Sequence, residues 1–194
     1  KAKGRPSDNP LIVHIFDMDT FQLVARRPAK AVIDLINRFW PGPLTIIVKK
    51  KKVVPDIVTS GLDTVALRMP DNKIALSLIK KAGVPLVAPS ANLSGRPSPT
   101  RGRDVIADLS GKIDVIIDGG KTRIGIESTV IDMTTSPPTL LRPGGLSVED
   151  IEKVVGHVQR LSTSHENMPA RSPGMKYRHY APKARMVIVE GDSD

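Results

Sequence analysis

Val84-Pro85-Leu86-Val87-Ala88 runs directly into Pro89-Ser90-Ala91-Asn92-Leu93-Ser94-Gly95-Arg96-Pro97-Ser98-Pro99-Thr100, so an apolar run ends in a loop of small polar residues. The apolar run predicts a strand, and the hydroxyls, carboxamide and glycine that follow it could cradle a polyanion or a nucleotide. Because Gly, Pro, Asn and Ser are also the common turn formers, an ordinary turn remains open as the alternative. The stretch therefore predicts a strand that ends in a candidate ligand loop.

Apolar runs and helical spacings alternate along the rest of the chain. Hydrophobic periodicity, together with residues that begin or end helices and strands, predicts strands at 11–16, 44–48, 64–69, 84–88, 113–117, 128–133 and 139–141. The same signals predict helices at 28–40, 71–81, 103–109 and 147–155. This order of elements predicts an α/β domain. Since some neighbouring strands have no helix between them, we expect a mixed sheet rather than a purely parallel one.

Composition narrows the functional class. The chain has 194 residues, 40% of them hydrophobic, and a net charge of +9, which favours anionic partners such as nucleotides, phosphates or RNA, with solubility as the alternative reason. It has no cysteine, and its four histidines lack metal-site spacing, so we expect no metal bound by protein side chains. No apolar run approaches the roughly 20 residues of a membrane span and no signal-peptide pattern is present, so we expect a cytoplasmic enzyme without a membrane partner.

The domain organisation changes after Gly156. Residues 1–156 carry the periodic pattern of one domain, which we expect to lack its N-terminal part because the sequence begins without an initiator Met. Residues 157–185 have little periodicity and predict a long linker or lid. Residues 186–194 contain a strand-like run that would begin a second domain.

Several cations are candidates for binding an anion. Lys3 and Arg5 are two positions apart, so in an extended segment both side chains would project from one side and could grip successive phosphates. Arg142 precedes a tight Pro-Gly-Gly turn. Arg68 lies in an otherwise apolar strand, where a buried arginine needs a carboxylate or phosphate partner. The alternatives are surface charges and, for Arg68, a side chain at a sheet edge.

Together these segments resemble the YrdC/Sua5 family of threonylcarbamoyl-AMP synthases. The motifs that carry the resemblance over residues 1–156 are Lys3-Gly4-Arg5, Pro10-Leu11, His14, Pro41-Gly42-Pro43-Leu44-Thr45, Arg68-Met69-Pro70, Pro89 to Gly95 and Glu127-Ser128-Thr129-Val130. Residues 172–182 resemble the interdomain linker of the two-domain form. The resemblance implies a YrdC-like twisted mixed sheet with flanking helices, then the linker and the first strand of a Rossmann-like second domain. The family's Thr-x-x-Tyr-Gly-Leu segment, upstream of its Lys-x-Arg motif, does not occur in this sequence.

The resemblance also implies a reaction and a site. L-Threonine, bicarbonate and ATP, with Mg2+, would give threonylcarbamoyl-adenylate and pyrophosphate for N6-threonylcarbamoyladenosine (t6A) at position 37 of tRNAs, made with a downstream transferase complex. Contact with tRNA would use the basic surface. No protein nucleophile is required, and Lys3 and Arg5 would stabilise charge. The ATP-binding residues implied are Lys3, Arg5, Thr64, Ser90, Asn92, Ser98, Arg142, His179 and Tyr180, and those for threonine are His14, Arg68, the backbone of Ala88, and Ser128.

Three alternatives remain open from the residues alone. Tyr177, His179 and Tyr180 lie in a basic segment that could close over a nucleotide as a lid, or could simply pack as a spacer. A basic RNA-binding module would fit the charge, although aromatics make up only 3% of the chain. The YrdC-like, carbamoyl-adenylate-forming domain of a hydrogenase-maturation carbamoyltransferase is the third, and the linker motif argues against it.

Overall fold

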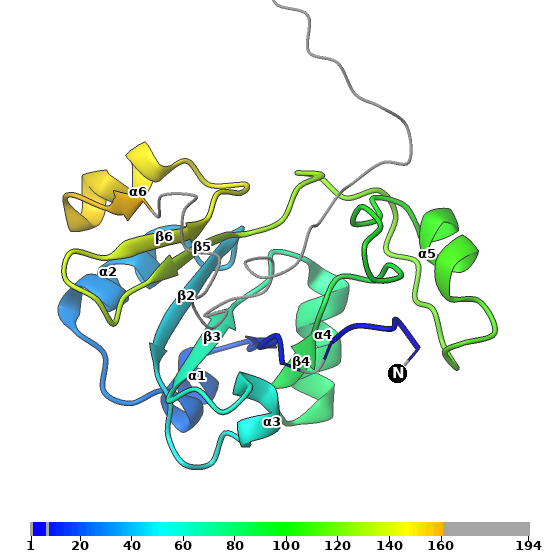
Figure 1. Cartoon of the computed structure of the whole chain (residues 1–194), viewed down its shortest axis with the longest axis horizontal. Coiled ribbons are helices and arrows are strands. Elements are labelled where there is room, and N and C mark those ends of the chain that lie inside the picture. Colours follow the sequence, from blue (N-terminus) through cyan, green and yellow to red (C-terminus); the bar gives the residue numbers. More distant parts are fainter. Residues whose placement is uncertain (1, 7, 161–194) are drawn as a thin grey trace, which may run out of the picture.

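One mixed sheet organises the protein, which is described here by a computed structural model covering residues 2–6 and 8–160. The strands run in the order β4-β1-β3-β2-β5-β6-β7 (Figure 1). Their bounds are β1 Ile12–His14, β2 Leu44–Lys49, β3 Thr64–Arg68, β4 Leu86–Ala88, β5 Thr129–Asp132, β6 Thr139–Arg142 and β7 Gln159–Arg160. The pairs β1–β3, β2–β5 and β6–β7 are parallel, and the other three are antiparallel. The predicted mixed α/β sheet is confirmed.

Six helices accompany the sheet in the described residues. They are α1 Met18–Val24, α2 Lys30–Phe39, α3 Asp56–Thr59, α4 Lys73–Ala82, α5 Gly102–Leu109 and α6 Val148–Val155. Two of them begin at side-chain caps of the types that helix N-termini favour: Asn72 Oδ1 accepts from the Ala75 amide at 3.0 Å, and Ser147 Oγ accepts from the Asp150 amide at 3.2 Å. Helix α4 ends at Gly83, whose φ of 69° suits a residue without a β-carbon.

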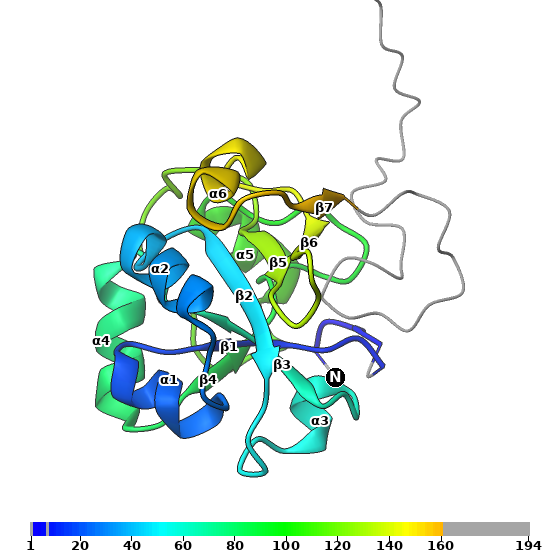
Figure 2. The ribbon, with the colours of Figure 1, turned by 90° about the vertical axis from the view of Figure 1, so that its left-hand side faces the viewer.

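The main hydrophobic core lies on one face of the sheet. Phe21 of α1 and Leu35 of α2 are fully buried there against Ile46 and Leu67, and Ile151 of α6 joins the same core. Figure 2 shows α1 and α2 together on one side of β2 and β3. The opposite face has a smaller apolar cluster, Ile12, Ile47, Ala66 and Val130. This second face is therefore the one with room for polar chemistry.

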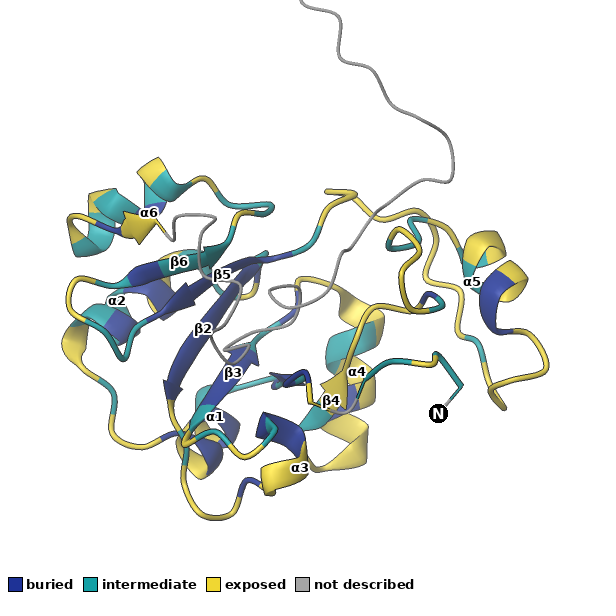
Figure 3. Cartoon of the chain, viewed as in Figure 1, coloured by how far each residue is buried: buried dark blue, intermediate teal, exposed yellow. Residues whose placement is uncertain are grey.

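The secondary-structure prediction missed helices α1 and α3 and placed one strand that does not form. The first turn of α1 is capped by Asp17, which accepts from the Thr20 amide at 2.8 Å. Residues 113–117 were expected to form a strand but form none, and Ile113, Val115 and Ile117 are exposed. Figure 3 shows the segment that follows α5 coloured mostly as exposed. The physical reason is that a strand is defined by pairing, and no neighbouring strand pairs with these residues in the described part of the chain.

The end of the described chain bears on the predicted linker. Strand β7 pairs with β6 and lies within residues 157–185, which the sequence assigned to the linker. The rest of that linker, the candidate lid residues His179 and Tyr180, and residues 186–194 lie outside the described residues. The division into domains stays a prediction.

Candidate active site

The register of the sheet brings predicted site residues onto its second face. His14 of β1 lies opposite Arg68 of β3 on one side and Leu86 of β4 on the other. Ala88 lies opposite Ile12 in the same pair of strands. Since paired residues project to the same side of a sheet, His14 and Arg68 share one face. Thr64 shares it too, but at the other end of β3.

Arg68 lies in a cavity of about 610 Å3. Its guanidinium donates through Nε to the Gly42 carbonyl at 3.0 Å. The cavity is lined by Gly42, Pro43, Arg68, Asp71 to Ile74 and residues 119–126. Burial lowers the pKa of Arg68, the nearby Arg142 lowers it further, and Asp71 opposes both. Because arginine stays charged at every physiological pH, this half-buried cation makes the cavity a site for an anion such as a carboxylate.

His14 is held neutral beside Arg68. Burial is the main cause that lowers its pKa to about 4, and the charge of Arg68 adds to it. Its Nδ1 is buried and has no hydrogen-bond partner within the described residues. A neutral imidazole next to an arginine can orient an uncharged amine without competing for an anion.

Arg142, Ser128 and Thr45 form a hydrogen-bonded network at the ends of β2, β5 and β6. Arg142 Nη2 donates to the Ser128 carbonyl at 2.9 Å and to its Oγ at 3.1 Å, and Arg142 Nε donates to the same carbonyl at 3.1 Å. The Ser128 and Thr45 hydroxyls are 2.7 Å apart. The structure thus unites Arg142, predicted for ATP, with Ser128, predicted for threonine, in one place.

The Pro143-Gly144-Gly145 turn sets the position of that network. A β-carbon on Gly144 would lie 2.5 Å from the backbone atoms of Glu127, Ser128 and Thr129. The Gly145 amide also donates to the Glu127 carbonyl at 2.9 Å. Glycine is required at position 144 because the two backbones approach too closely for any side chain.

Lys3 clamps the polar loop after β4. Its ammonium donates to the backbone carbonyls of Ser90 and Asn92, and Asn92 Oδ1 lies 3.3 Å away. The Ser94 amide in turn donates to the Lys3 carbonyl at 2.9 Å. Burial lowers the pKa of Lys3, and Arg5 lowers it further. The loop is therefore folded around a positive charge, as a phosphate site requires.

Arg5 is held differently from the prediction. Gly4 has a φ of 65°, so the segment turns and the two cations do not project from one side of an extended chain. Arg5 donates to the carbonyls of Asn9 at 2.7 Å and Pro10 at 2.8 Å. The expected geometry is wrong because a glycine that adopts positive φ breaks the alternation of a strand. The two charges are still close enough for Arg5 to lower the pKa of Lys3.

Ser98 connects the polar loop to the Arg142 network. Its hydroxyl donates to the Glu127 carboxylate at 2.5 Å, and Glu127 directly precedes Ser128. Asp108 of α5 supports the loop from behind, because its carboxylate accepts from the Leu93 amide at 3.0 Å and from Arg96. Sequence reasoning missed Thr45, Glu127 and Asp108 as site residues. Thr45 and Glu127 stood within quoted motifs, whereas nothing local marks Asp108.

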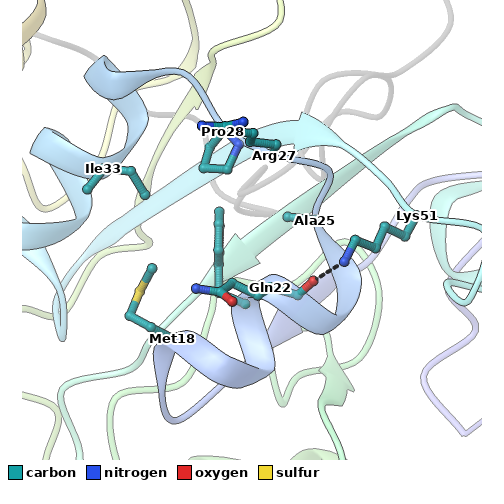
Figure 4. Close-up of a pocket in the computed structure, with 8 residues that line it drawn as sticks. Met18, Gln22, Ala25, Arg27, Pro28, Ile33 and Lys51 are labelled. Atoms are coloured by element: carbon teal, nitrogen blue, oxygen red, sulfur yellow. Dashed lines mark hydrogen bonds between the residues drawn. The ribbon is translucent and has the colours of Figure 1, made fainter.

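A second cavity, of about 330 Å3, lies between α1 and the start of α2 (Figure 4). Met18, Gln22, Ile33 and Lys51 line it with Phe21, Ala25, Arg27 and Pro28. Lys51 Nζ donates to the Gln22 carbonyl at 2.6 Å across its rim. None of the predicted site residues lines it, so the candidate active site is the second face of the sheet.

Residues 2–6 and 8–160 contain no group of three or more His, Asp or Glu side chains placed to hold a metal ion. None of their helices combines the length and apolar character that crossing a bilayer needs.

The comparisons with known proteins decide the family. Residues 1–144 match the model of the Sua5, YciO and YrdC proteins, described as "Telomere recombination". The chain belongs to the Sua5/YciO/YrdC family. Residues 146–194 match the model described as "Threonylcarbamoyl-AMP synthase, C-terminal domain", which separates this chain from family members without that domain.

Individual relatives support this family assignment. The threonylcarbamoyl-AMP synthase of Pyrococcus abyssi is 54% identical over 100% of this chain and 58% of its own length. That of Bacillus subtilis is 52% identical over 100% of this chain and 57% of its own. The crystal structure of P. abyssi Sua5 complexed with L-threonine superposes with a TM-score of 0.94 at 53% identity, covering 99% of this chain and 57% of that one. The chain thus spans little more than half the length of these relatives.

Proposed function

We propose that this chain contains the catalytic region of a threonylcarbamoyl-AMP synthase. The observation that carries the proposal is a connection between two regions, the cavity at Arg68 and the polar loop that Lys3 clamps. The 2.5 Å hydrogen bond from Ser98 to Glu127 and the Arg142–Ser128 network lie between them. The similarity to P. abyssi Sua5, solved with L-threonine, supports the same amino acid as substrate. The product would serve t6A formation at position 37 of tRNAs.

The amino acid would bind beside β1 and β3. Arg68 would pair with the threonine carboxylate, because it lines the cavity and, among the described residues, its guanidinium makes one hydrogen bond, to the Gly42 carbonyl. Neutral His14 would orient the amine, and the Ala88 backbone and Ser128 would complete the site. The amine would then attack the carbon of bicarbonate, with loss of water, and form a carbamate.

The nucleotide would bind on the side of the polar loop. Charge there would come from Lys3, Arg5 and Arg142, and neutral hydrogen bonds from Thr64, Ser90, Asn92 and Ser98. A carbamate oxygen would attack the α-phosphorus of ATP, the bond to the β-phosphate would break, and pyrophosphate would leave. Since both reactants are anions, positioning and charge neutralisation by these residues would supply most of the catalysis. His179 and Tyr180 would close the site as a lid.

Mg2+ would arrive with the triphosphate rather than in a cage of protein carboxylates. The cations and hydroxyls of the site fit that arrangement, since Mg2+ commonly binds substrate phosphates with few protein ligands. Its chemistry would be to neutralise the departing pyrophosphate.

Threonine-dependent pyrophosphate release tests the proposal. The full-length protein is incubated with ATP, bicarbonate and labelled threonine, and the adenylate and pyrophosphate are measured. Both products should appear only when all three substrates are present. ATP turnover that ignores threonine would contradict the proposal, and activity with carbamoyl phosphate in place of threonine would favour the hydrogenase-maturation class. The match of residues 146–194 to the synthase C-terminal domain supports the first outcome.

The domain organisation and location follow the same proposal. We place the catalytic domain at 1–156, the linker at 157–185 and the start of the second domain at 186–194. We also propose a cytoplasmic location and a downstream t6A transferase complex as partner, because the adenylate has to reach tRNA.

A basic surface at the end of β2 is the proposed contact for tRNA. Lys50 and Ala25 form an isolated antiparallel β-bridge through their backbones, which places Lys49 to Lys52 beside Arg26 and Arg27. Asp63 and Asp56 pair with Lys49 and Lys50 and leave an excess of positive charge. The double variant Lys51→Glu/Lys52→Glu should lower the dependence of log affinity for tRNA on log salt by about 2. Lys80→Glu/Lys81→Glu, an equal change on α4, is the control, and an equal loss in both variants would refute this location.

A further inference from the structure

The segment of residues 119–126 closes one side of the Arg68 cavity and is held at two points. The Thr122 amide donates to the Thr100 carbonyl at 3.0 Å, which ties the segment to the end of the polar loop. The residue after Thr122, Arg123, forms an ion pair with the carboxylate of Asp71, which lines the same cavity. The pair therefore joins two segments that line the cavity together with Arg68.

Asp71 is a potential competitor for the substrate. Among the described residues that line this cavity, it is the one that carries a carboxylate. It follows Arg68 by three positions, and its charge already acts on Arg68, whose pKa it raises. A guanidinium that must take up a threonine carboxylate is weakened as a site if a carboxylate of the protein reaches it first.

We propose that Arg123 is a positioning residue of the amino-acid site: by pairing with Asp71 it keeps that carboxylate from Arg68 and leaves the Arg68 guanidinium for the carboxylate of the substrate. The proposal rests on the proposed function, in which Arg68 takes the threonine carboxylate. It assigns Arg123 no contact with substrate and no part in the chemistry. The side chains of Arg123 and Asp71 are 76% and 50% exposed, so the pair contributes little to stability and its loss should leave the fold intact.

A double-mutant cycle on the full-length protein tests the idea. The KM for threonine, the KM for ATP and kcat are measured for wild type, Arg123→Gln, Asp71→Asn and the double variant. We expect Arg123→Gln to raise the threonine KM by about threefold to tenfold, since a freed carboxylate competes with the substrate at the scale of one exposed ion pair. The KM for ATP and kcat should stay within about twofold. Asp71→Asn should lower the threonine KM slightly, and the double variant should return to within about twofold of wild type.

The rescue by the second substitution separates this role from a structural one. If Arg123 merely tethers the segment, the double variant will be as impaired as Arg123→Gln, and that result would overturn the proposal. An unchanged KM in Arg123→Gln would overturn it too. Arg160→Gln removes an exposed pair of the same type, with Glu149 at 3.2 Å, and is the control for loss of a surface charge. Arg68→Gln separates failure of the proposed function from failure of the proposed role of Arg123. If Arg68→Gln leaves the threonine KM unchanged, the proposed function of Arg68 fails. If Arg68→Gln raises the threonine KM and Arg123→Gln does not, only the role of Arg123 is refuted.

Discussion

On β3, Val65 and Leu67 belong to the large core beneath α1 and α2, whereas Ala66 and Arg68 belong to the opposite face. The same alternation holds on β1, where Val13 is buried with the helices and His14 lies beside Arg68. One face is predominantly apolar, and the other places an arginine and a neutral histidine beside a small apolar cluster. The comparison teaches that a strand with period 2 can stabilise the fold and build the site at the same time.

Substitutions at adjacent residues of β3 test whether the two faces of the sheet have separate roles, and the largest effect is expected in the core. Leu67→Ala should lower the free energy of unfolding by about 2–5 kcal/mol, because Leu67 is fully buried in the main core. Denaturant unfolding measures this loss. The threonine KM of the remaining folded protein should stay near that of wild type, and a large KM change with little loss of stability would show that the two faces are not separate.

Arg68→Gln is the matched change on the other face. We expect the threonine KM to rise by about tenfold to a hundredfold, because a charged, bidentate partner of the carboxylate is lost. Arg68→Lys should recover part of the affinity, since it restores the charge but not the two-pronged geometry. Steady-state kinetics check both, and an intact KM together with a large loss of stability would assign Arg68 to the fold instead.

Gly144→Ala tests a turn on which both the stability of the fold and the position of the Arg142–Ser128 network depend. The new β-carbon would lie 2.5 Å from the backbone of residues 127–129, so we expect a loss of about 1–3 kcal/mol in stability. The displaced Arg142–Ser128 network should also lower kcat/KM. Gly119→Ala is the control, because its β-carbon would meet Ile74 Cδ1 at an ordinary 3.5 Å. Equal destabilisation of both variants would show that the close approach is not the cause.

The smallest expected effect is the pH dependence that His14 gives to stability. Its pKa is lowered to about 4 in the folded protein, so the unfolded chain binds a proton more readily between its own pKa of 6.5 and that value. Stability should therefore be fully present above about pH 6.5 and fall as the pH drops toward 4, by about 1 kcal/mol over the first pH unit. In His14→Asn this slope should be reduced. Parallel pH profiles of urea unfolding for the two proteins would argue against a buried, neutral His14.

Much of the fold could be predicted from local patterns. The caps at Asn72 and Ser147, the stop at Gly83, the apolar run of β2 and the alternation of β3 are all signals within a few residues, and the structure confirms these elements. Helix α1 was missed since its single buried stripe is only seven residues long. The strand expected at 113–117 failed because pairing, unlike apolar alternation, depends on a partner far away in the chain.

The site also has one part that sequence motifs predicted and another part that could not be predicted from local patterns. Family motifs identified Arg68, Ser90, Asn92 and Ser128 as candidates, and the structure brings His14, Arg68, Ser128 and Arg142 to one face of the sheet. The assignment of each residue to threonine or ATP remains a prediction. The capture of the Lys3 ammonium by loop carbonyls 87 and 89 positions away could not be read from any local pattern.

By itself the sequence determined the α/β class, the positions of most strands and helices, and which motifs are candidates for the chemistry, because these depend on residue type and on spacing within one or two turns. Only the tertiary structure decided which face of the sheet each side chain occupies, that Thr45 meets Ser128, and that Arg123 pairs with Asp71. The physical reason is register: contacts between distant segments are set by how strands pair and how the core packs, and a shift of a single residue would move every side chain of a strand to the opposite face.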